Sequence, residues 1–229
     1  MKRILILTIL LMSSLAWAGS TTVVVGQGGG APTCLTDNFT SLAQDGALET
    51  YNSNYKSISE TIKVTNLEGG AGGGLVRVEA AYTVAGCYYD DGSGAKSGTT
   101  YTTATVDDGG TNYMPYPITR ASADNMGYAA RLSHPSGGNW TRIYVMKNGA
   151  ELGWTACTIT QSTAHTIYLK ARDSGANVVV EIWVDDNTGD PDATKTDTSD
   201  VISSGYAGFY YPGTDNVVWT VDDFSDCAF

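Results

Sequence analysis

Two short segments, one near each end of the chain, carry matching patterns in opposite order. The first, CLTDNF, begins at Cys34, and the second, DDFSDC, ends at Cys227. If the two segments pair antiparallel with the cysteines opposite each other, Asp37 faces Phe224 and Phe39 lies diagonal to Phe224 on one buried face. We therefore predict that these segments are the first and last strands of one closed β-domain and lie side by side.

The first 18 residues have the three parts of a secretory signal peptide. Lys2 and Arg3 precede an apolar run over residues 4–15, and small residues follow at Ala16-Trp17-Ala18. This order is typical of a signal that is removed on export. The apolar run is shorter than the roughly 20 residues that a membrane span needs. We expect a secreted or extracellular protein, at the cell surface or in a periplasm, without membrane insertion.

Residues 19–33 are predicted to be a Gly-rich leader or linker. The strand-like run Thr21–Val25 is followed by glycines within Gly26–Gly30. Glycine-rich linkers are flexible, which favours a frayed tail. A run of β-branched residues can instead pair with a sheet edge, in its own chain or in a neighbouring copy. The leader is therefore either a simple tail or a strand for self-assembly.

All four cysteines (Cys34, Cys87, Cys157 and Cys227) lie after the signal peptide. An even number of cysteines in an oxidising compartment predicts two disulfides, although four cysteines allow three connectivities. We favour Cys34–Cys227 and Cys87–Cys157, and the first of these would close nearly the whole domain. The sequence has no close cysteine pair, so zinc binding is not expected.

The charge of the chain restricts its partners. It has 13 basic and 24 acidic residues, and without Lys2 and Arg3 the count becomes 11 against 24, a net charge of −13. Such a chain repels nucleic acid and anionic membranes. It also disfavours strongly acidic polysaccharides, unless cations screen the charge.

Strand-like runs between turn-forming clusters predict an all-β fold. Leu75–Val84 is the clearest run, because apolar and polar residues alternate along it. Glycine and aspartate clusters at residues 69–74, 90–94, 107–110 and 185–191 are typical of turns. The other predicted strands are Ile58–Thr65, Thr100–Val106, Tyr128–Ser133, Trp140–Met146, His165–Arg172, Val178–Asp185, Tyr206–Tyr211 and Val217–Phe224. We expect about ten strands in two sheets, within a single domain over residues 34–229.

The ordered set of these patterns resembles the concanavalin A-like lectin/glucanase superfamily, which includes laminin-G-like domains. The resemblance rests on Asp37-Asn38-Phe39, residues 127–133 with Tyr144-Val145, residues 169–172 with 178–185, residues 198–205 with Gly208-Phe209, and residues 221–224. It implies a two-sheet antiparallel jelly-roll sandwich. It does not fix the function, because the superfamily contains lectins, adhesion modules, hydrolases, lyases and virion or appendage proteins.

Glu181 is the candidate catalytic residue for a hydrolase. Glu181, Trp183 and Asp185 share one strand face, which resembles the acid-bearing strand of laminarinase-type glucanases. The sequence departs from that pattern, since Trp183 replaces the middle acid and Asp185 replaces the last glutamate. A glycosidase needs two suitably spaced carboxyl groups, so a solvated, non-catalytic Glu181 is favoured. For a lyase, His165, Tyr144 and Arg131 could supply the base and the arginine, but no spacing in the sequence requires it.

Aromatic and arginine side chains on neighbouring strands are candidates for glycan binding. Sugars bind to aromatic faces and to planar polar groups. The candidates are Arg131, Trp140, Arg142 and Tyr144 on one strand pair, Trp183 on a later strand, and Tyr113 and Tyr116 in a proline-containing loop. The alternative is that these aromatic residues belong to the sandwich core.

A structural calcium ion is the expected cofactor, if there is one. Several members of the superfamily hold calcium where the terminal strands meet, which points to Asp37, Asp222 and Asp223. The acidic run over residues 185–192 does not follow the EF-hand order and is better explained by turn formation.

The leading hypothesis is a secreted, non-catalytic lectin-like domain that binds a neutral or weakly charged polysaccharide or glycan surface. The first alternative is a glycoside hydrolase or polysaccharide lyase on the same fold. The second is a structural or adhesive extracellular protein that assembles through Thr21–Val25. The shape of the sheet face should discriminate among the three. A deep groove with two facing carboxylates favours an enzyme, a shallow aromatic groove favours a lectin, and a flat, filled face favours structural assembly.

Overall fold

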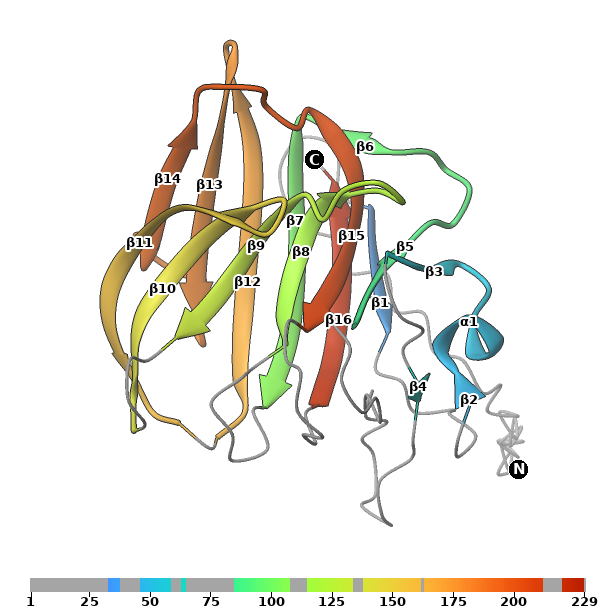
Figure 1. Cartoon of the computed structure of the whole chain (residues 1–229), viewed down its shortest axis with the longest axis horizontal. Coiled ribbons are helices and arrows are strands. Elements are labelled where there is room, and N and C mark those ends of the chain that lie inside the picture. Colours follow the sequence, from blue (N-terminus) through green and yellow to red (C-terminus); the bar gives the residue numbers. More distant parts are fainter. Residues whose placement is uncertain are drawn as a thin grey trace, which may run out of the picture.

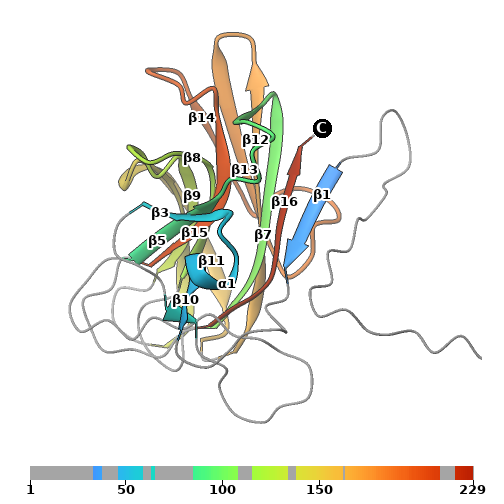
Figure 2. The same ribbon diagram turned by 90° about the vertical axis from the view of Figure 1, so that its right-hand side faces the viewer.

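The computed structural model describes residues 33–37, 46–58, 63–64, 85–107, 115–133, 138–161, 163–211 and 220–228. Within these ranges the protein is built almost entirely of β-strands, with one short helix, α1 (Leu48–Tyr51). Two antiparallel sheets pack face to face, as Figures 1 and 2 show from two directions. The predicted all-β, two-sheet jelly-roll sandwich is confirmed.

The first sheet has six strands and contains both ends of the domain. Its order is β1 (Thr33–Asp37), β16 (Thr220–Ala228), β7 (Thr99–Asp107), β12 (His165–Ser174), β13 (Asn177–Val184) and β14 (Ala193–Asp197). Figure 1 shows this sheet behind the other one.

The second sheet has eight strands. Its order is β11 (Ala150–Ile159), β10 (Trp140–Lys147), β9 (Tyr128–Ser133), β8 (Tyr116–Ala121), β15 (Ser204–Tyr211), β5 (Ala85–Tyr89) and β3 (Tyr55–Ser57), and β6 (Lys96–Ser97) pairs with β15 off this path. A separate small sheet joins β2 (Gly46–Ala47) and β4 (Lys63–Val64).

The core lies between the two large sheets and is filled by alternating residues of their strands. In β12, Ile167, Leu169 and Ala171 are fully buried, while the residues between them are partly exposed. Phe224 is also fully buried, with its ring centroid 5.8 Å from that of Phe209 across the sandwich. This alternation is what a sandwich with two solvent-facing outer faces requires.

The terminal strands pair in the predicted register. Cys34 lies opposite Cys227 and Asp37 opposite Phe224 in the β1–β16 pair. Cys227 is disulfide-bonded, which together with this register supports the predicted Cys34–Cys227 bond. Phe39 lies outside the described residues.

The predicted Cys87–Cys157 disulfide is wrong. Both residues are free thiols. Cys87 is on β5 and Cys157 on β11, which are five strand positions apart in the same sheet. At about 4.8 Å per step this separation is roughly 24 Å, whereas a disulfide needs Cα atoms within about 7 Å.

Most of the predicted strands are found, and some were missed. β9 matches its prediction residue for residue, and β7, β10, β12, β13 and β15 match within two residues. No prediction was made for β5, β8, β11 and β14. The predicted loop over Asn112–Pro117 is corrected at its end, because Tyr116 and Pro117 begin β8. The signal peptide, residues 19–32 and Leu75–Val84 lie outside the described residues.

Candidate functional site

The outer face of the eight-stranded sheet carries a row of aromatic and arginine side chains. Trp154 of β11 lies opposite Tyr144 of β10, and Tyr144 lies opposite Arg131 of β9. The row continues on β8 with Tyr116, two positions from the Ile118–Ala129 pair, and Tyr116 pairs with Tyr210 of β15. Four strand steps of about 4.8 Å give a row roughly 19 Å long, enough for several linked sugar rings.

The β11 end of this row is the most open to solvent, while Tyr210 at the β15 end is half-buried. Trp154 is 44% exposed, whereas Tyr116 is 3% exposed. Burial raises the pKa of Tyr116, so this hydroxyl stays protonated at every physiological pH. Tyr116, a predicted ligand residue, is therefore placed beside the open end as a packing residue. The most exposed side chain of the row is Trp154 on β11, next to β10 and β9.

Four side chains form this open end, and we call Arg131, Arg142, Tyr144 and Trp154 the quartet. The Arg142 guanidinium lies 4.7 Å from the centroid of the Trp154 ring, and its Nη1 donates a 3.0 Å hydrogen bond to the Tyr144 hydroxyl. The Arg131 guanidinium lies 5.7 Å from the Tyr144 ring centroid. Each stacked contact of this kind contributes about 0.5–1 kcal/mol at an exposed site. The quartet is thus held in place before any ligand arrives.

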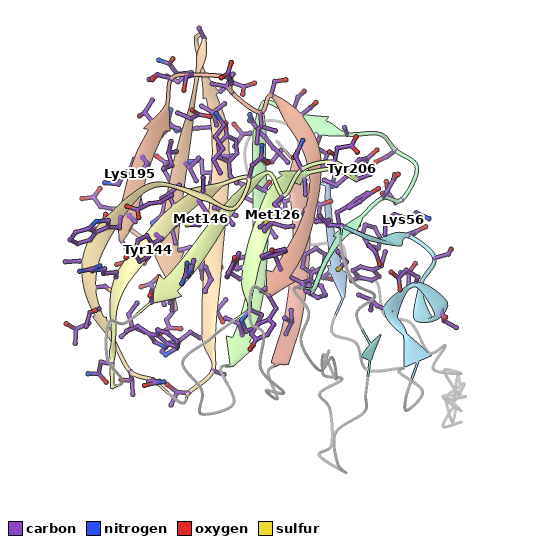
Figure 3. All side chains as sticks on the ribbon, viewed as in Figure 1. Lys56, Met126, Tyr144, Met146, Lys195 and Tyr206 are labelled. Carbon is purple, nitrogen blue, oxygen red and sulfur yellow. The ribbon has the colours of Figure 1, made fainter. Side chains whose placement is uncertain are left out.

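Figure 3 shows the position of the quartet on the sheet. Tyr144 lies toward the β11 edge of the near face, and Tyr206 lies toward the β5 side of the same face. Met146 and Met126 lie between them, and Met146 is 6% exposed. The face therefore has an aromatic–arginine end and a tyrosine end, separated by a packed apolar region.

Trp140 was predicted to share the face of Arg142 and Tyr144, and this is wrong. The pairing of β10 with β11 shifts register between Trp140 and Arg142. A register shift of this kind inserts an extra residue and reverses the alternation of side chains beyond it. Trp140 is consequently fully buried in the core with Ile143 and Val145, while Arg142 and Tyr144 face outward.

Trp183, another predicted ligand residue, belongs to the other sheet. It lies on β13 and is 7% exposed. Its indole Nε1 donates to the Gly189 carbonyl oxygen, and the Lys170 ammonium lies 5.7 Å from its ring centroid. Trp183 therefore does not join the quartet. Tyr113 lies outside the described residues.

Glu181 has the surroundings of a structural ion pair. Lys170 Nζ lies 2.9 Å from Glu181 Oε2, and Arg172 lies 3.3 Å from the same carboxylate. Burial favours the neutral carboxyl, but hydrogen bonds and charges from Lys170 and Arg172 outweigh it and lower the pKa of Glu181. A general acid for glycoside cleavage needs a raised pKa. This environment fits the non-catalytic reading of Glu181.

The residues considered for a lyase are not brought together. His165 lines a cleft of about 360 Å³ between β11 and the ends of β12 and β13, whereas Tyr144 and Arg131 are on the outer face. The two ring nitrogens of His165 face the Asp185 carboxylate at 2.8 Å and the Thr160 carbonyl at 2.6 Å. The Thr163 hydroxyl also lies 3.2 Å from Nε2, so both ring nitrogens are engaged by neighbouring groups of the protein.

The predicted calcium ligands remain a prediction. The backbones of Asp37, Asp222 and Asp223 belong to β1 and β16, as expected, but their side chains are not among those described. Within the described part of the chain, no group of three or more His, Cys, Asp or Glu residues could hold a metal ion. In the 185–192 run, Asp186 accepts hydrogen bonds from Thr188 and Asp192 accepts from Val184, which is turn formation as expected.

Sequence reasoning missed four aromatic residues of this face. Trp154, Tyr210, Tyr88 and Tyr206 all point outward, and the rings of Tyr88 and Tyr206 stack with centroids 5.3 Å apart. Tyr88-Tyr89 and Tyr210-Tyr211 are adjacent pairs, so one ring of each must face outward once the strand is known. Trp154 follows Gly153 in a strand whose sequence shows no clear alternation of apolar and polar residues. Only its pairing with Tyr144 shows that it lies on the outer face.

Comparison with known proteins supports the fold. No protein-family model and no curated protein matches the chain. The carbohydrate-binding module CBM66 from Bacillus subtilis is 18% identical, with a TM-score of 0.50 over 76% of this chain and 95% of that chain. A peanut lectin with a nine-residue peptide is 10% identical, with a TM-score of 0.53 over 86% and 97%.

A third similar structure is a protein of unknown function from Shewanella oneidensis MR-1, 12% identical, with a TM-score of 0.51 over 93% of this chain and 96% of that chain. These likenesses confirm the concanavalin A-like fold at the level of architecture. No helix in the described ranges is long and apolar enough to cross a membrane.

Proposed function

We propose that this protein is a secreted, non-catalytic glycan-binding domain and that the quartet is its binding site. The observation that carries the proposal is the exposed Trp154 ring beside Tyr144, with Arg131 and Arg142 held against these two rings. An exposed ring accepts the apolar face of a sugar, and guanidinium groups donate to its hydroxyls.

Three features support this proposal over catalysis. The quartet contains no carboxylate, Glu181 is held ionised on the other sheet, and the site is a surface row rather than an enclosed pocket. Preorganised aromatic side chains lower the entropic cost of binding, since they are already ordered in the free protein. The fold is one that carbohydrate-binding modules and lectins share, which is consistent with the proposal.

The test is binding to a panel of immobilised glycans, followed by titration with soluble fragments of any glycan that is retained. Trp154→Ala and Tyr144→Ala should each weaken binding at least about tenfold, because central aromatic residues carry a large part of the energy of an interface. Tyr168→Ala is the matched control, since Tyr168 lies on the outer face of the six-stranded sheet and should not affect binding.

The outcome is readable in two independent ways. Trp154 is the exposed large apolar side chain of the described residues, so bound sugar should change the tryptophan emission of the native protein and not of Trp154→Ala. Absence of binding to every glycan of the panel would reject the proposal. Release of reducing ends or unsaturated sugars that Glu181→Gln abolishes would favour an enzyme instead.

A further inference from the structure

Most cationic side chains of the described residues have a carboxylate partner. The pairs are Lys96–Asp226, Arg120–Asp173, Lys147–Asp197, Lys170–Glu181 and Arg172–Glu181. No described carboxylate lies within ion-pair distance of Arg131 or Arg142, and the same holds for two lysines, Lys56 and Lys195, which lie outside the quartet. A chain with 24 acidic residues thus keeps two guanidinium groups of one surface site unneutralised.

The two guanidinium groups are also close to each other. Arg142 lies opposite Ser133 and Tyr144 opposite Arg131, so the two arginines are diagonal neighbours across β9 and β10. Diagonal neighbours are about 7–8 Å apart, which is within reach of two long side chains for one common ligand group. Two like charges at this separation repel each other unless an anion lies between them.

The donors of these groups remain available. The Arg142 guanidinium lies over the Trp154 ring and uses one N–H, on Nη1, for the Tyr144 hydroxyl, which leaves its other N–H groups for a ligand. A guanidinium presents five N–H donors in a planar fork that matches a carboxylate.

The opposite end of the same face is acidic. Asp90 and Asp91 directly follow β5 and accept hydrogen bonds from the turn after it, and Lys56 lies opposite Tyr88 on β3. Burial, together with the charges of Asp90 and Asp124, raises the pKa of the Tyr88 hydroxyl. The quartet lies on β9–β11, whereas Tyr88 lies on β5, several strands away. An anionic ligand would therefore meet attraction over β9–β11 and repulsion over β5.

We infer that the glycan bound by the quartet carries an isolated carboxylate, as an acidic sugar in an otherwise neutral chain, and that Arg131 and Arg142 bind this carboxylate. The inference rests on the proposed function, and it restricts the ligand to glycans that carry an acidic sugar. A densely charged polyanion is disfavoured because the net charge of the protein is −11 and the β5 end of the face is acidic.

The test compares matched pairs of oligosaccharides by calorimetric titration. Each pair consists of an oligosaccharide with a single uronate, such as a glucuronate-bearing xylan fragment, and its carboxyl-reduced form, and the pairs span several neutral backbones. Oligogalacturonate serves as the dense polyanion and a sulfated galactan fragment as the alternative anion. The acidic member of at least one pair should bind about tenfold more tightly than its reduced form, a preference of about 1.4 kcal/mol.

Variants test which side chains cause the preference for the acidic form. Arg131→Gln should bring the affinity ratio of acidic to reduced form close to one, because the affinity for the acidic form should fall more than the affinity for the reduced form. Arg142→Lys keeps the charge but loses the fork and the stacking, so it should lower the ratio only in part. Arg172→Gln, on the six-stranded sheet, is the matched control and should preserve the ratio.

The outcomes separate this inference from the proposed function. If the acidic and reduced members of every bound pair bind equally, and Trp154→Ala loses the binding of both, carboxylate recognition is rejected while glycan binding by the quartet stands. If oligogalacturonate or the sulfated fragment binds more tightly than the single-uronate oligosaccharides, the preference for an isolated carboxylate is rejected. Binding of no oligosaccharide would reject both.

Discussion

Asp197 is a carboxylate that the sandwich has buried together with its hydrogen-bond donors. It is 1% exposed, and its Oδ2 accepts from the Tyr128 hydroxyl at 2.6 Å and from Lys147 Nζ at 2.9 Å. Burial alone would favour the neutral carboxyl, but these hydrogen bonds and a backbone N–H from Ser199 lower the pKa of Asp197. Its charged form is thus part of the native structure.

The pH dependence of stability follows from this shift. The native pKa of Asp197 lies below its unfolded value of about 4, so its stabilisation is present above about pH 4 and is lost as the pH falls through the native pKa. Asp197→Asn should lower the free energy of unfolding by about 2 kcal/mol at pH 7. In urea titrations the difference between variant and native protein should shrink below pH 4. A constant difference at all pH values would contradict this account.

At the scale of elements, strand β8 is shaped by a residue with positive φ and by two glycines packed against it. Arg120 has φ +57°, and its guanidinium is fully buried, donating to the Ile202 carbonyl at 2.8 Å. A Cβ at Gly205 would lie 2.3 Å from the Arg120 carbonyl carbon, and a Cβ at Gly127 would lie 2.1 Å from the Thr119 carbonyl oxygen. The bend of β8 therefore requires bare backbone on both sides.

Gly127→Ala and Gly175→Ala form a matched test of this packing. Their φ angles are +66° and +64°, but a Cβ at Gly175 would meet open space. Gly175→Ala should cost about 1 kcal/mol from the backbone alone, and Gly127→Ala about 3 kcal/mol or more because the added methyl overlaps the β8 backbone. Denaturant unfolding measures both. Equal losses of unfolding free energy in the two variants would show that the cost of Gly127→Ala comes from its φ angle and not from the close approach of the β8 backbone.

The same scale explains what the sequence predicts well and what it does not. β9 and β12 alternate regularly, and their bounds follow from the pattern. β11 contains Gly153 and small residues and gives no such signal. The register shift in β10 turns Trp140 into the core, and no local sequence pattern predicts this shift. Arg131, Arg142 and Tyr144 could be predicted as neighbours, whereas Trp154 joins them only through long-range pairing.

At the scale of the whole molecule, pairing of the first and last described strands closes the six-stranded sheet at one edge. The position of this pair was predictable because the two segments carry matching residues in opposite order. That Cys87 and Cys157 are free thiols was not predictable, since an even number of cysteines says nothing about the distance between them across a sheet.

The terminal disulfide should therefore dominate the response to cysteine replacement. Cys227→Ser should lower the free energy of unfolding by about 2–5 kcal/mol, because the loop that it closes is very long. Cys157→Ser should change it by less than about 1 kcal/mol, since this thiol is only partly buried. Peptide mapping without reduction should find Cys34 linked to Cys227, with Cys87 and Cys157 unlinked. A linked Cys87 or Cys157 would contradict the structure.

The β1–β16 pair also determines how the domain responds to mechanical load. The chain enters at Thr33 and leaves at Ala228, which lie opposite each other at the same end of the pair. Tension between the two flanking segments would peel the strands apart one pair at a time, beginning there. The next pair is Cys34 and the disulfide-bonded Cys227, so peeling would stop at the first covalent link. Under such tension the two sheets and the quartet would bear no force, and the domain would act as an inextensible link.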